Sequence, residues 1–170
     1  MTTPSEPYGF PDDPMPEVRA VTAHLAHIKG GRPFPRRSDL RPEEMPPSAF
    51  PRLFLVSVER ESDGKGGTRL RFFYRLVGDG ISHATGATWV GKYLDEVVER
   101  DLGDIIAPYY EAAVTARRPV RQPYLFKSLR YEEPNPSLRY LFPLSEDGAT
   151  IDGLLGLFLI LEGPWAAKEK

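Results

Sequence analysis

The sequence predicts an α+β domain in which an antiparallel sheet is covered by helices on one face. Strand-like segments occur in two groups, two of them around residue 60 and three after residue 120, and helical segments lie between the groups. Turns of hairpin length separate the strands within each group, and this spacing favours antiparallel pairing. The chain has 170 residues, of which 41% are hydrophobic, so it can form one sizeable core.

An amphipathic helix is expected before the sheet, over residues 14–29. Asp13 can cap this helix, Pro14 suits its first turn and Gly30 ends it. Four apolar residues recur at steps of three and four and form one stripe: Val18, Val21, Leu25 and Ile28. The stripe must be buried, either on the chain's own domain or on a partner helix. We predict that it forms the interface of a homodimer.

The segments around this helix are expected to be irregular. Residues 1–13 are predicted to be a disordered tail. Residues 14–51 are predicted to contain the helix and a connector rich in proline, because many of the 18 prolines of the chain precede residue 52. Proline disfavours helix both at its own position and at the one before it, so we expect extended chain with at most one short turn.

A compact domain is expected over residues 52–163, followed by a tail over residues 164–170. Its first two strands are predicted over residues 52–59 and 69–77, with a glycine-rich hairpin loop between them. The second strand alternates, so that one of its faces carries Leu70, Phe72, Tyr74 and Leu76.

Helices are expected in three places after these strands, over residues 81–85, 91–99 and 102–118. The longest includes Pro108, which is expected in its first turn or at a kink because proline disrupts a helix interior. Three more strands are expected over residues 120–131, 138–144 and 154–162.

The last of these strands is apolar on both faces, with Leu154, Leu155, Leu157, Phe158, Leu159, Ile160 and Leu161. A strand with helices on only one side should alternate between apolar and polar residues. We therefore expect a second cover on the other face of the sheet. The helix over residues 14–29 or a second subunit could supply it.

Charge and cysteine content exclude some classes of protein. The net charge is -2, so nothing draws the chain towards nucleic acid or an anionic membrane, and we expect it to bind neither. The longest apolar run is far shorter than the ~20 residues that span a bilayer. Cysteine is absent, which is compatible with the cytoplasmic location that we expect.

Six short motifs occur in order between Phe34 and Leu161: residues 35–42, 52–56, 74–81, 91–94, 143–148 and 153–156. This set resembles PAS domains, and in particular bacterial proteins made of little more than one PAS domain. The resemblance implies a five-stranded antiparallel sheet of spatial order 2-1-5-4-3, helices on one face and a pocket between them. It also implies a sensory or protein-interaction role, but a fold names no ligand.

Aromatic residues are candidates for lining such a pocket, and we predict this role for Trp89, Tyr110, Tyr74, Phe126 and Phe142. No cofactor is expected, because a flavin adduct needs a cysteine and haem usually needs a histidine. His83 is expected to be a helix residue without such a role. His24 and His27 have a spacing that can bind metal, but no convincing third ligand joins them, so no metal is expected.

Two further patterns invite a binding role. The arginines at positions 32, 36, 37 and 41 form two R-x-x-x-R patterns, but the companion motif of cyclic-dinucleotide sites is missing. We expect these arginines to pair with acidic groups of the domain. Binding of a phosphate-bearing partner is the alternative. Gly78 and Gly80 favour a tight turn, since the rest of a dinucleotide-binding loop is absent.

No nucleophile elbow, Walker loop or HExxH motif is present, and we do not expect an enzyme. We predict a regulatory or sensory domain that acts through protein contacts, as a homodimer and with an unknown signalling partner. A small ligand in the cavity could gate it. No kinase, cyclase or DNA-binding segment is expected outside the domain, so the signal should leave through an interface. The alternative is a small-molecule binding protein or minor enzyme that uses the same cavity.

Overall fold

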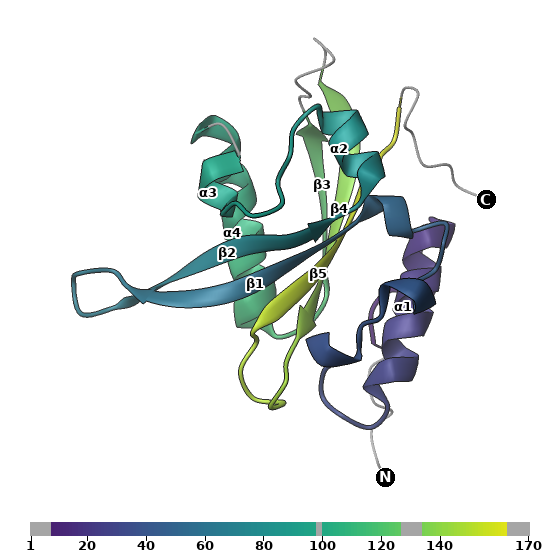
Figure 1. The fold of residues 1–170 in the computed structure, drawn as a ribbon, viewed down its shortest axis with the longest axis horizontal. Coiled ribbons are helices and arrows are strands. Elements are labelled where there is room, and N and C mark those ends of the chain that lie inside the picture. Colours follow the sequence, from purple (N-terminus) through teal and green to yellow (C-terminus); the bar gives the residue numbers. More distant parts are fainter. Residues whose placement is uncertain (1–7, 98–99, 127–133, 163–170) are drawn as a thin grey trace.

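The computed structural model describes residues 8–97, 100–126 and 134–162 and forms one five-stranded sheet. The strands lie in the order β2-β1-β5-β4-β3, and every neighbouring pair is antiparallel (Figure 1). Their bounds are Leu53–Ser62 for β1, Thr68–Val77 for β2, Val120–Phe126 for β3, Asn135–Leu144 for β4 and Gly153–Ile160 for β5. The predicted fold class and strand order are confirmed.

Three helices lie on one face of this sheet, and residues from them share a core with the strands. They are α2 (Asp79–Thr85), α3 (Leu94–Val97) and α4 (Arg100–Ala116). Pro108 lies inside α4, beyond the first turn in which the sequence allowed it. The strand predicted over residues 120–131 is described only to Phe126, and residues 127–131 fall outside the described part of the chain.

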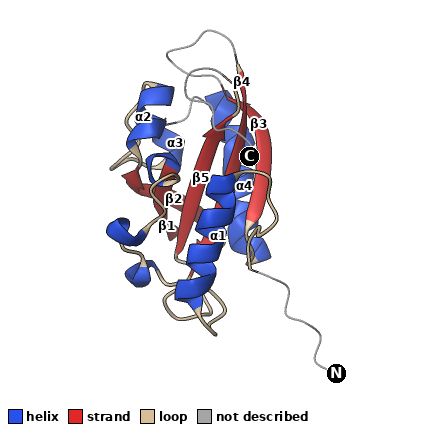
Figure 2. Ribbon diagram, turned by 90° about the vertical axis from the view of Figure 1, so that its right-hand side faces the viewer, coloured by secondary structure: helices blue, strands red, loops and turns tan. Residues whose placement is uncertain are grey.

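The fourth helix, α1 (Pro16–Lys29), covers the opposite face of the sheet (Figure 2). Its apolar stripe packs against β4 and β5 together with Met45, Ala49 and Leu53. The helix begins two residues later than predicted, and Asp13 does not cap it, because the N-cap residue is Met15 and no side chain caps the helix there. Oδ1 of Asp13 instead accepts a hydrogen bond from the backbone N–H of Met15, at 2.9 Å, in the turn that precedes the helix.

The structure also corrects the prediction of a disordered tail over residues 1–13. Tyr8, Phe10 and Asp13 are packed, so residues 8–13 are not part of a disordered tail although Pro11 and Asp12 are exposed, whereas residues 1–7 fall outside the described chain. The ring of Phe10 packs edge-on against Tyr140, with 5.3 Å between ring centroids. The connector also holds more structure than expected, with short 3-10 helices at Arg37–Asp39, Pro42–Glu44 and Phe50–Arg52.

Every residue of β5 is buried, because helices cover both faces of the strand. Leu154, Phe158 and Ile160 belong to the core beneath α2 and α4, whereas Leu155, Leu157 and Leu159 pack under α1. The sequence predicted a second cover, and the chain supplies it from its own N-terminal helix. The sheet therefore separates two cores, which we call the helix-side core and the α1-side core.

Candidate functional site

An arginine lies inside the helix-side core. Alternate residues of a strand point to opposite faces, and β4 follows this rule with Arg139 and Leu141 on one face and Leu138, Tyr140 and Phe142 on the other. The side chain of Arg139 is only 2% exposed and is the largest fully buried one among the described residues.

Five aromatic rings surround the guanidinium group of Arg139. Its Cζ atom lies 5.1 Å from the ring centroid of Tyr124, 5.3 Å from Tyr110, 5.5 Å from Phe158, 5.6 Å from Phe54 and 5.9 Å from Trp89. We call these five residues and Arg139 the Arg139 cage. The rings come from β1, β3, β5, α4 and the segment between α2 and α3, so the whole fold contributes to it. Each ring face attracts a cation at such distances.

The guanidinium group has few hydrogen-bond partners. Nη2 donates to the hydroxyl of Tyr124 at 2.9 Å, while Nε and Nη1 are buried without a partner. Among the residues whose side chains the structure describes, which exclude 100–105, no carboxylate lies within 4.0 Å of a nitrogen atom of Arg139. A buried charge without a counter-ion is unfavourable by several kcal/mol after relaxation, and ring faces offset only part of this.

The tyrosines of the site do not supply the missing negative charge at neutral pH. Burial raises the pKa of Tyr74 and Tyr110, and it raises the pKa of Tyr124 to about 12. The phenols are therefore neutral. For Arg139 burial lowers the pKa, and the phenolates that Tyr110, Tyr124 and Tyr74 form only at high pH raise it, so the net direction is upward. A guanidinium group stays protonated in proteins, so Arg139 is charged.

A glycine makes room for the cage. A Cβ atom at Gly156 of β5 would lie 1.9 Å from the ring of Phe54, far inside contact distance. The ring therefore rests directly on the backbone of β5. It also stacks on Tyr110 at an interplanar angle of 12°, with 6.1 Å between centroids.

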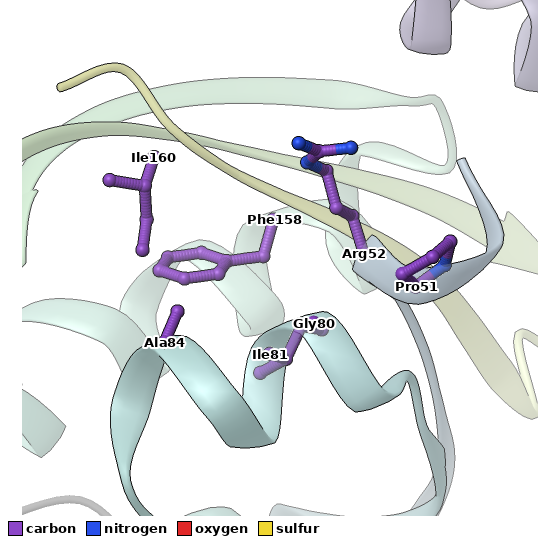
Figure 3. Close-up of a pocket in the computed structure, with 7 residues that line it drawn as sticks. All are labelled: Pro51, Arg52, Gly80, Ile81, Ala84, Phe158 and Ile160. Atoms are coloured by element: carbon purple, nitrogen blue, oxygen red, sulfur yellow. The ribbon is translucent and has the colours of Figure 1, made fainter. Parts of the chain in front are cut away.

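A pocket adjoins the cage between β5 and α2, with a volume of about 230 Å³ (Figure 3). Its walls are mostly apolar and include Ile81, Ala84, Phe158 and Ile160, with Arg52 at one side. Phe158 belongs to both places, since it lines the pocket and its ring centroid lies 5.5 Å from the guanidinium carbon of Arg139. The pocket and the cage therefore share the Phe158 ring, and Arg139 itself does not line the pocket.

Four of the five predicted pocket residues lie together in the helix-side core, but none of the five lines the pocket beside α2. Trp89 and Tyr110 belong to the cage itself. Tyr74 joins it through a 2.7 Å hydrogen bond between its hydroxyl and that of Tyr110, and Phe126 packs edge-on against Phe158 at 5.1 Å.

Phe142 is the exception, and its assignment to the pocket is wrong. It lies in the α1-side core, 5.9 Å from the ring of Phe10, because strand alternation places it on the face opposite Arg139. Sequence reasoning also missed Arg139. The available signal was alternation within β4, which places this arginine on the same face as Leu141.

The apolar stripe on α1 packs against the sheet of its own chain. Val18, Val21 and Leu25 have no exposed surface and pack against the chain's own sheet, and Ile28 is half-buried beside them. Their prediction as a homodimer interface is corrected, since they form an intramolecular contact. Intramolecular burial was the other outcome that the pattern allowed.

The basic connector pairs mainly with itself and its neighbours. Arg32 and Arg36 both contact Asp39, with N–O distances of 2.5 and 3.0 Å. Arg37 donates to the hydroxyl of Ser57 at 2.9 Å. The acidic partner of Arg32 and Arg36 is thus Asp39 within the connector, and not an acidic group of the domain as the sequence predicted.

The strand order β2-β1-β5-β4-β3, with helices between β2 and β3, defines a PAS-like fold. No protein-family model matches the chain, and no curated protein matches it. None of the helices in the described residues is long and apolar enough to cross a membrane.

Solved structures of PAS and light-oxygen-voltage (LOV) domains are similar to the chain at low identity. A variant of RsLOV is 18% identical, with a TM-score of 0.46 over 69% of this chain and 66% of that one. The PAS domain of BvgS from Bordetella pertussis is 15% identical, with a TM-score of 0.47 over 67% and 79%. An RNA-binding light-oxygen-voltage receptor is 18% identical, with a TM-score of 0.42 over 64% and 28%. The chain thus spans under two thirds of the first and last of these proteins.

Proposed function

We propose that the chain is a cytoplasmic regulatory domain in which a change in the helix-side core alters a protein contact on the α1 side. One observation carries this proposal. Arg139 and Tyr140 are neighbours in β4, and they face opposite cores. The first lies in the aromatic cage, and the second holds the segment that leads into α1.

The contact on the α1 side is a buried hydrogen bond. The hydroxyl of Tyr140 donates to Oδ2 of Asp13 at 2.8 Å, and Oδ1 of the same carboxylate accepts from Met15 at 2.9 Å. A shift of β4 that moves Arg139 must also move Tyr140, because the two share a backbone. Such a shift would strain the start of α1. Coupling between two sites of this kind typically amounts to 1–3 kcal/mol.

A second copy of the chain is the partner that we propose for the α1 side. Leu125 of β3 is 64% exposed, the largest exposed fraction among the large apolar residues of the described chain. It shares a strand face with Arg121, whose Nε lies 3.2 Å from the hydroxyl of Tyr140. An exposed leucine on an edge strand is a suitable contact for self-association.

Hydrogen exchange tests the coupling. Tyr110→Trp enlarges a cage residue that does not touch α1, and Tyr109→Trp is the matched control, because Tyr109 is exposed on the same helix. We expect Tyr110→Trp to change amide protection in α1 and β5 together, and Tyr109→Trp to leave both unchanged. If α1 keeps its protection while β5 changes, the proposed route is wrong. The alternative of a simple small-molecule binding protein predicts that independent behaviour.

A further inference from the structure

The geometry points to a small organic acid as the ligand of this domain: its carboxylate binds Arg139 in the cage, and its apolar part fills the pocket beside α2. This inference deepens the proposed function by naming the ligand class. It starts from the missing counter-ion. Arg139 is fully buried and charged, and two of its nitrogen atoms have no hydrogen-bond partner.

The cage offers hydrogen-bond donors and lacks an anionic acceptor among the described residues. A guanidinium group donates only. The Tyr124 hydroxyl already accepts from Arg139 and keeps its own hydrogen to donate. Tyr74 and Tyr110 share one hydrogen bond, in which one hydroxyl donates and the other keeps a hydrogen for a further acceptor. An anion with two oxygen atoms would satisfy several of these donors at once.

A carboxylate matches this set better than a phosphate. Its two oxygens fit the planar edge of a guanidinium group, and its single negative charge equals the single positive charge of Arg139. A phosphate that carries close to two charges would leave part of its charge uncompensated in a site that excludes water. The cage therefore selects a monoanion.

The pocket specifies the rest of the molecule. Its volume of about 230 Å³ is below the ~300–1,000 Å³ that is usual for ligand pockets, so the acid must be small. Its walls of Ile81, Ala84 and Ile160 favour an aliphatic chain or a single ring. Arg139 does not line this space, and Phe158 is the residue that the pocket shares with the cage, so the Phe158 ring must move for the carboxylate to reach the guanidinium group.

Trp89 offers a direct readout. Its ring centroid lies 5.9 Å from the Arg139 guanidinium carbon and 6.3 Å from the Phe158 ring centroid. Binding of the carboxylate to Arg139 and movement of the Phe158 ring would therefore both occur beside Trp89. The chain has two tryptophans, and Trp165→Phe leaves Trp89 as the only one. Benzoate and hexanoate are suitable probes. Benzyl alcohol, acetate and inorganic phosphate serve as controls that lack the charge, the apolar part or the carboxylate.

We expect benzoate or hexanoate to change Trp89 fluorescence saturably, with a Kd below about 1 mM, and to raise the melting temperature. The three control compounds should bind at least tenfold more weakly. Arg139→Met, once shown to be folded by circular dichroism, should lose tenfold or more in affinity. If it does not fold, Arg139→Lys and the pocket-filling Ala84→Phe should each show that loss. Absence of saturable binding, equal binding of benzyl alcohol or phosphate, or unchanged affinity in these variants would overturn the inference.

The same samples separate this inference from the proposed function. Carboxylate binding through Arg139 without any change in α1 protection would uphold the ligand class and refute the coupling. A response of α1 to Tyr110→Trp, in a protein that binds none of the acids, would uphold the coupling and refute the ligand class.

Discussion

The Tyr140 hydroxyl donates a hydrogen bond of 2.8 Å to Oδ2 of Asp13, although 127 positions separate the two residues. This contact joins the central part of the sheet to the segment that precedes α1. Burial raises the pKa of Tyr140, so its hydroxyl keeps its proton and stays a donor throughout the neutral range.

Removal of that hydroxyl should loosen α1. Tyr140→Phe leaves a buried carboxylate oxygen without its donor, and hydrogen bonds to charged groups are worth about 1.5–3 kcal/mol. We expect the free energy of unfolding to fall by about that amount in urea titrations, with lower amide protection at the start of α1. Tyr109→Phe, at an exposed position, should change it by less than about 0.5 kcal/mol. A Tyr140→Phe protein as stable as the original would show that the bond is not important.

Addition of one methyl group to β5 should disturb the cage. Gly156→Ala places a Cβ atom within 1.9 Å of the Phe54 ring, and overpacking of a core usually destabilises by about 1–3 kcal/mol. We expect such a loss in thermal or urea unfolding. Gly31→Ala is the control, because a Cβ atom there meets nothing within 4 Å. Phe54→Leu should partly rescue Gly156→Ala in the double variant. Additive losses in the two variants would contradict a direct clash.

Truncation of the α1 stripe should reduce stability without altering the subunit count. Leu25 has no exposed surface, and Leu→Ala changes in a core remove about 2–5 kcal/mol. Ile28→Ala should lose less, since Ile28 is half-buried. Urea unfolding and native mass spectrometry measure the two properties on one sample. A change of subunit count at unchanged stability would restore the stripe as a subunit interface.

Self-association, if mediated by β3, should depend on Leu125. Leu125→Asp adds a charge to a surface that is already 64% exposed, so the folded monomer should keep its stability. We expect the mass in native mass spectrometry to change from dimer to monomer. Val90→Asp, at another exposed apolar position, should leave the mass unchanged. A monomer in the unmutated protein would refute the proposed dimer.

Acid should destabilise the turn between β4 and β5 through Asp147. Backbone N–H groups of Thr150 and Ala149 lower the pKa of this carboxyl from its ordinary value of 3.8 to about 2. A folded pKa below the unfolded value means that the stabilisation is complete above about pH 4 and is lost as the pH falls towards 2. Asp147→Asn should therefore be less stable than the original at pH 5, and the difference should shrink by pH 2.

Urea titrations at several pH values measure this convergence. Glu111→Gln, an exposed position on α4, provides the comparison and should stay parallel to the original protein at every pH. A constant gap between Asp147→Asn and the original would mean that the turn does not depend on this charge.

Local patterns in the sequence determined most elements of the fold. Alternation in β2 as far as Tyr74, the stripe on α1 and the turns between strands are set by neighbouring residues, so they can be read without a structure. Beyond Tyr74 a register shift places Val77, and not the predicted Leu76, against the helix-side core. The apolar residues on both faces of β5 likewise implied a second cover. Trp89, Tyr110, Tyr74 and Phe126 were predicted to lie between the sheet and the helices and do so, but none of them lines the pocket beside α2.

The tertiary structure alone decided which surfaces meet. A hydrophobic stripe must be buried, but a local pattern does not say whether its partner is the same chain or another one. Here α1 folds back on its own sheet, and residues 8–13 follow it. The face of Phe142 and the burial of Arg139 depend on the register of β4 between β3 and β5. Alternation within β4 places Arg139 on the same face as Leu141, but its burial results from five rings that distant segments contribute.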